Sequence, residues 1–198
     1  MSQISARQKS YFYAIGRFIH FFSRVESALH VSFAEFASIP DPVARAIKRG
    51  SKSGELIAMI KGVIVATKMN EKDTKEIKTV FDQFEAIAQF RDRVIHRGAS
   101  VKTDGTFFSS NLATMKTPEL WEFTTFTVQD IRNATDDLIR INLRILRIAF
   151  DLPMRAMKSR ARGLFLPWRY KPVKLQTPRS QTLPYLLSPA IRPRSSRR

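Results

Sequence analysis

IKTVFDQFEAIAQFRDRVIHRG, residues 77–98, is the stretch from which the architecture of this chain is most readily worked out. Its apolar residues recur every three or four positions, the spacing of one face of an α-helix. They are Ile77, Phe81, Phe84 and Ala88, with Val94 and Ile95 near the end. Asn70 and Asp73 lie upstream at the spacing of a helix start, and Gly98 marks the end, because glycine readily adopts the left-handed conformation that follows a helix.

Three more amphipathic segments surround this helix. The first carries an apolar stripe from Tyr11 to Phe36 and ends before the prolines of IPDP, residues 39–42. The second runs through residues 56–66. The last runs through residues 131–148. All three show the helical period, so we expect four main helices.

The segment before the last helix has a different character. VKTDGTFF, residues 101–108, places Asp-Gly between β-forming residues, the strongest short signal for a hairpin. LWEFTTF, residues 120–126, is suited to a further strand. The sequence therefore predicts an all-α fold, a bundle of four main helices with a small β-hairpin inserted before the last helix.

The strong positive charge is concentrated at one end of the chain. Of 34 Lys and Arg residues, 12 lie in residues 153–198, which contain no acidic residue. Residues 1–152 then hold 22 basic and 17 acidic residues, a net charge of +5. We predict a helical domain over residues 1–152 and a basic, proline-rich, disordered tail over 153–198. The composition of the tail is suited to binding RNA, DNA, an acidic protein or an anionic membrane. The same composition is also found in a segment with no selected function.

Several classes of function are disfavoured by what the sequence lacks. There is no cysteine, and the three histidines have no metal-ligand spacing, so we expect no metal and no cofactor. The phosphate-binding motifs GxxxxGK[ST] and GxGxxG do not occur, so the sequence does not support nucleotide hydrolysis of the kinds that use them. The polar N-terminus has no signal-peptide pattern, and charged residues interrupt every apolar run, so we expect a cytoplasmic protein without a transmembrane segment.

The charged end of the helix over residues 77–98 is the candidate site. Arg91 continues the apolar stripe, so it must find a partner or face another subunit. Asp92 and His96 are four residues apart and share a face, which would let the carboxylate orient the imidazole. Arg91 and His96 are about 140° apart on an ideal helix, so we expect them to need a partner surface or local unwinding to meet.

Two interpretations of this cluster stay open. In the first, His96 transfers protons and Arg91 stabilises charge on a phosphate. In the second, Arg91 is bound at a dimer seam and His96 caps the helix. Arg93 and Arg97 are solvated, or bind RNA phosphates if the site is active. Glu26 is a candidate for structural support, by pairing with Arg91 or capping a buried polar group.

These residues resemble the HEPN domain superfamily, helical bundles that carry an RX4-6H motif near the end of the third main helix. FRDRVIH, residues 90–96, fits the motif, with Asp92 as the polar residue after the arginine. RVESAL, residues 24–29, is similar to part of the first helix of such proteins. The resemblance covers about residues 8–150 and leaves the tail out.

The resemblance implies a homodimer in which two Arg91/His96 motifs face each other. It implies a metal-independent endoribonuclease of a toxin or defence kind, with RNA as substrate and an antitoxin or other protein as partner. The alternative is a catalytically inactive HEPN-like module that binds a partner protein, nucleotide or nucleic acid. A third interpretation is a helical nucleic-acid-binding protein that acts through its basic tail.

Overall fold

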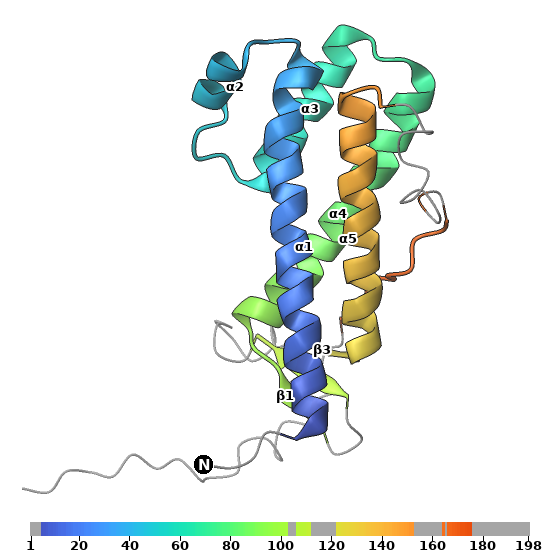
Figure 1. The fold of residues 1–198 in the computed structure, drawn as a ribbon. Coiled ribbons are helices and arrows are strands. Elements are labelled where there is room, and N and C mark those ends of the chain that lie inside the picture. The colour runs from blue at the N-terminus through green and yellow to red at the C-terminus, as the bar shows by residue number, and fades with distance from the viewer. Residues whose placement is uncertain (1–4, 103–105, 112–121, 153–163, 165, 176–198) are drawn as a thin grey trace, which may run out of the picture.

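A computed structural model describes residues 5–102, 106–111, 122–152, 164 and 166–175. Within these residues the chain forms five helices and three short strands (Figure 1). The four longer helices are those predicted from the apolar stripes, and the short α2 lies between the first two of them. The elements are α1 (Ala6–Ala37), α2 (Asp41–Ile47), α3 (Ser53–Thr67), α4 (Glu71–His96), β1 (Ser100–Val101), β2 (Phe107–Ser110), β3 (Phe123–Phe126) and α5 (Val128–Ala149).

The bundle is built around the long pair α1 and α5, which lie side by side (Figure 1). Helix α3 packs against α1, and α4 packs against α5. The apolar stripes of all four helices meet in one continuous core that includes Phe18, Leu29, Ile60, Phe84 and Leu138, each nearly inaccessible to solvent. The predicted all-α bundle is therefore confirmed at the level of a helical bundle.

The β-segment is larger than the predicted hairpin. Its strands form a three-stranded antiparallel sheet in the order β1-β2-β3. Strand β3 joins because Phe107 pairs with Phe126 and the two rings stack 5.8 Å apart, which buries both. The predicted Asp104-Gly105 turn and the first two residues of the predicted strand over 120–126 lie outside the described residues.

This sheet holds the C-terminal end of α4 in place. The Phe107 ring stacks on Tyr11 of α1 at 4.2 Å, and the Phe126 ring meets Phe90 of α4 edge-on at 5.4 Å. The Ser109 hydroxyl donates a 2.8 Å hydrogen bond to the Arg93 carbonyl. The sheet therefore fixes the last turns of α4 through aromatic packing and one side-chain hydrogen bond.

Residue 164 and residues 166–175 form what we call the C-terminal strap, which runs beside α5 (Figure 1). Leu164 and Tyr170 are each only 1% exposed, and the Tyr170 ring lies 5.1 Å from Phe90. The prediction that the chain separates from the helical body after residue 152 does not hold for this segment. The rest of the predicted tail lies outside the described residues.

The strap is held by polar groups buried on α5. Asp137 is fully buried and accepts hydrogen bonds from the Arg169 and Tyr170 backbone amides, at 3.1 and 2.8 Å, and from Gln83. Burial raises the pKa of the Asp137 carboxyl above its ordinary value, against the opposite effect of these hydrogen bonds and of Arg140. Arg140 and Arg144 donate to strap carbonyls in turn, and the Arg144 guanidinium lies over the Trp168 ring.

Candidate functional site

Helix α4 remains regular as far as its charged end. It continues through His96, and the Arg97 amide still bonds to the Arg93 carbonyl. Gly98 follows with φ of +67°, the left-handed conformation predicted for the end of this helix. Because no unwinding occurs here, the geometry of the cluster is that of a helix surface.

Arg91, Asp92 and His96 converge on this surface. The Arg91 Nη1 atom lies 2.8 Å from Asp92 Oδ1 and 3.2 Å from His96 Nε2. The expectation that Arg91 and His96 need a second surface or local unwinding to meet is therefore wrong. The angle between two Cα positions does not limit an arginine, because its long side chain can reach around the helix to the imidazole.

The direction of the Arg91–His96 contact determines the form of the imidazole. A guanidinium group only donates hydrogen bonds, so His96 Nε2 must accept and must be unprotonated in this arrangement. Asp92 Oδ1 is 3.8 Å from the same nitrogen, beyond hydrogen-bond distance. Asp92 thus binds the arginine, and the prediction that it orients the imidazole is not met.

Arg91 also packs against a side chain of α1. Its guanidinium carbon lies 5.3 Å from the centroid of the Phe22 ring, a cation–π contact. Its Nε atom is buried and has no hydrogen-bond partner among the described residues. The charge that continues the apolar stripe of α4 is thus accommodated by one carboxylate and one aromatic face. This leaves Arg91 near the surface, with about a third of its side chain exposed.

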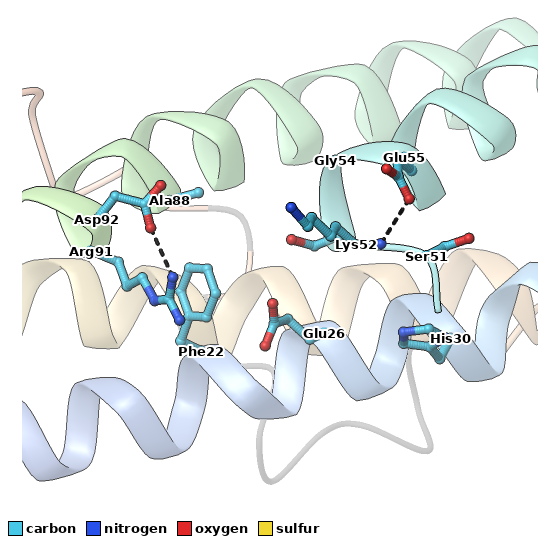
Figure 2. A pocket seen from close by; sticks show the side chains of 11 residues that line it. Phe22, Glu26, His30, Ser51, Lys52, Gly54, Glu55, Ala88, Arg91 and Asp92 are labelled. Atoms are coloured by element: carbon cyan, nitrogen blue, oxygen red, sulfur yellow. Dashed lines mark hydrogen bonds and ion pairs between the residues drawn. The ribbon is translucent and has the colours of Figure 1, made fainter. Parts of the chain in front are cut away.

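A groove of about 740 Å³ extends from Arg91 along α1 (Figure 2). Arg91 and Asp92 lie at one end, and His30 lies at the other, beside the start of α3. Its size is within the range of small-molecule and nucleotide sites. The lining residues come from α1, from the first residues of α3 and the two residues before it, and from α4: Phe22, Glu26, His30, Ser51, Lys52, Ser53, Gly54, Glu55, Ala88, Arg91 and Asp92.

Glu26 lies inside this groove but does not play the predicted part. It forms no ion pair with Arg91, and it caps no buried polar group within the part of the chain that the structure describes. Arg91 is bound by Asp92 instead, the nearer carboxylate in sequence. Figure 2 shows Glu26 between the Arg91–Phe22 pair and His30, with its carboxylate directed into the groove.

The two other arginines of the motif have neighbours within the chain. Arg97 forms a 3.6 Å ion pair with Glu122, just before β3. Arg93 is two residues from Arg91, about 200° around the helix. Its positive charge opposes the rise that burial causes in the pKa of Tyr170. Their role as RNA contacts stays a prediction.

His30 is the groove residue that the sequence interpretation did not select. Phe22, Glu26 and His30 are spaced at i, i+4 and i+8, so one side of α1 carries all three. This spacing is the signal by which the sequence could have placed His30 on the same side of α1 as Phe22 and Glu26. Burial and the nearby Lys48 lower the pKa of the His30 imidazole below its ordinary value, and Glu26 opposes them.

No group of three or more metal-binding side chains occurs among the described residues. No helix in the described ranges is long and apolar enough to cross a membrane. Comparison with protein-family models, curated proteins and solved structures yields no match to this chain. The site is therefore interpreted from its own geometry.

Proposed function

We propose that this protein is a metal-independent endoribonuclease in which Arg91 binds the scissile phosphate and His96 transfers a proton. The observation that carries the proposal is the 3.2 Å contact between Arg91 Nη1 and His96 Nε2 at the surface of α4. A fixed cation and an adjacent base are the two groups that cleavage of RNA without metal requires. The HEPN resemblance points to the same pair of residues.

The chemistry proposed here is transesterification within one nucleotide. Binding of the phosphate draws the Arg91 guanidinium away from His96, which frees the Nε2 lone pair. His96 Nε2 then removes the proton from a ribose 2′-hydroxyl, and the 2′-oxygen forms a bond to phosphorus. The bond from phosphorus to the 5′-oxygen breaks, and a general acid protonates that oxygen. The products are a 2′,3′-cyclic phosphate and a 5′-hydroxyl. Arg91 stabilises the charge that builds on the non-bridging oxygens, as a planar donor to phosphate.

A homodimer would supply the general acid. His30 lines the far end of the groove, eight residues along α1 from Phe22, the residue that supports Arg91, which is about 12 Å along the helix axis. That distance is too long for His30 to act on a phosphate bound at Arg91. We propose instead that His96 of a second protomer, in its protonated form, donates the proton to the leaving oxygen.

The groove also favours the rival interpretation, a module that binds a nucleotide or a partner without cleaving it. Its volume is ample for a ligand, and much of its polar lining lies away from His96. Mutation separates the two functions, because catalysis depends on His96 whereas binding in the groove does not.

The test uses the full-length protein in EDTA with single-stranded RNA, because the strap is part of the packed fold. We expect His96→Ala to slow cleavage by about 10²–10⁴-fold, the usual contribution of a general acid or base. We expect Arg91→Lys, which keeps the charge but loses the planar pair of donors, to slow it at least about tenfold. His20→Ala is the matched control, because His20 is exposed on α1 and does not line the groove.

Unchanged cleavage in His96→Ala would contradict the proposal. No cleavage by a folded wild-type protein, with RNA still bound in the groove, would favour the binding module.

A further inference from the structure

Glu26 occupies the middle of the groove. It lies one helical turn from Phe22, which supports Arg91, and one turn from His30 at the far end. Its side chain is partly buried, and it forms no hydrogen bond or ion pair with any described residue. A partly buried carboxylate that has lost some of its water and makes no hydrogen bond in return carries a cost in stability.

The charges around Glu26 suggest what such a carboxylate is for. Arg91 is already bound to Asp92, and Glu55 accepts a hydrogen bond from the Lys52 backbone amide. The Lys52 ammonium group lines the groove and is unpaired among the described residues. A groove for phosphate alone would gain nothing from Glu26, because like charges repel. The ligand of this groove must therefore bring hydrogen-bond donors as well as negative charge.

We propose that Glu26 is a specificity-determining residue that accepts two hydrogen bonds from the Watson–Crick edge of a guanine next to the phosphate held by Arg91. This inference rests on the proposed function and names the substrate more closely. Among the RNA bases, guanine alone places two adjacent donors, N1–H and the N2 amino group, opposite the two oxygens of one carboxylate. Unstacked bases of single-stranded RNA are read at this edge.

The spacing along α1 agrees with one nucleotide. Phe22 and Glu26 are four residues apart, about 6 Å along the helix axis, so a phosphate at Arg91 and a base at Glu26 can belong to one nucleotide. Lys52, from the opposite wall, is available to the neighbouring phosphate. The groove thus offers two cations for phosphates and one carboxylate for the base.

The test measures binding of the full-length protein to 2′-fluoro oligonucleotides, which have no 2′-hydroxyl and cannot be cleaved by the proposed route. Fluorescence anisotropy compares a uridine oligomer holding one guanine with the same oligomer holding inosine, which lacks the N2 amino group. We expect about tenfold tighter binding of guanine, which lies within the range by which a good bidentate contact discriminates against the wrong base. Glu26→Gln should bring the ratio close to one, whereas Glu35→Gln, a control at an exposed residue of the same helix outside the groove, should leave it unchanged.

Equal affinity of the wild type for the two oligomers, no binding to either, or a guanine preference that survives in Glu26→Gln would each overturn the inference. The wild-type comparison does not depend on how any variant folds. RNA cleavage that needs His96 but shows no guanine preference would retain the proposed function and reject the role of Glu26. Guanine-selective binding without any cleavage of RNA would do the reverse.

Discussion

Replacing Tyr170 with alanine tests whether the C-terminal strap is part of the folded protein. The ring is 1% exposed, lies 5.1 Å from Phe90 and belongs to the main core, although it is 21 residues beyond the end of α5. Phe90 immediately precedes Arg91, so the strap supports the turn of α4 that carries the site. The substitution removes this support and leaves a cavity beside Phe90.

The size of the effect follows from the area that the ring buries. A tyrosine buries roughly 150–250 Å², and truncation of a large buried aromatic residue to alanine costs about 3–5 kcal/mol of unfolding free energy. For a chain of this length, each kcal/mol lowers the melting temperature by about 2–4 °C. We therefore expect Tyr170→Ala to melt roughly 6–20 °C below the wild type.

The assay is urea unfolding followed by circular dichroism, with the melting temperature as a second measure. Tyr13→Ala is the matched control, because this tyrosine is 67% exposed and its loss should change stability by less than about 0.5 kcal/mol. A Tyr170→Ala protein as stable as the Tyr13→Ala protein would refute the reasoning. The strap would then be detached in solution, and Phe90 would be exposed.

Three further changes probe the same framework. Burial raises the pKa of Tyr170 to about 12. The stability that the neutral hydroxyl provides is therefore complete below pH 10, near its ordinary pKa, and is lost as the pH rises toward 12. Tyr170→Phe should flatten this fall in unfolding free energy, as measured by urea titration between pH 10 and 12. Asp137→Ala removes the acceptor of the strap amides and the ionic partner of Arg140, so it should cost about 3–5 kcal/mol by the same assay. A loss below about 1 kcal/mol would show that Asp137 contributes little to holding the strap. Gly98→Ala should cost about 1 kcal/mol of unfolding free energy; the cost comes from the positive φ alone, because no atom lies within 4 Å of the added carbon. Gly62→Ala inside α3 should be neutral or stabilising. Equal effects of the two substitutions would contradict the helix-end geometry.

The bundle was predictable because each long helix carries a continuous apolar stripe. The stripe of Phe81 and Phe84 identifies α4, and the residues it marks are buried as expected. Gly98 indicated the end of the helix for a reason that the backbone bears out. Local periodicity and end signals act over a few residues, so sequence alone reveals them.

The strap was not predictable in the same way. Asp137, Arg140 and Arg144 lie on α5 at positions that sequence reasoning assigns to solvent, and their partners are 20 to 33 residues away along the chain. Composition indicated disorder for a basic, proline-rich segment. The burial of Tyr170 depends on long-range hydrogen bonds that have no periodic signature.

The candidate site was predictable in its residues and not in its geometry. The motif selected Arg91 and His96, but the helical angle between them suggested that they stay apart, and the arginine reaches across. Glu26 was selected for a pairing with Arg91 that Asp92 makes instead. His30 was passed over because a lone histidine beside an apolar stripe gives little indication that another helix forms a groove over it.

The most direct test of the account is the chemical nature of the RNA ends left by the full-length protein in EDTA. A defined single-stranded oligonucleotide is incubated with the protein, and the products are weighed by mass spectrometry. The account predicts a 2′,3′-cyclic phosphate on one fragment and a 5′-hydroxyl on the other, both lost in His96→Ala. Fragments with a 5′-phosphate, or identical products from His96→Ala, would contradict it.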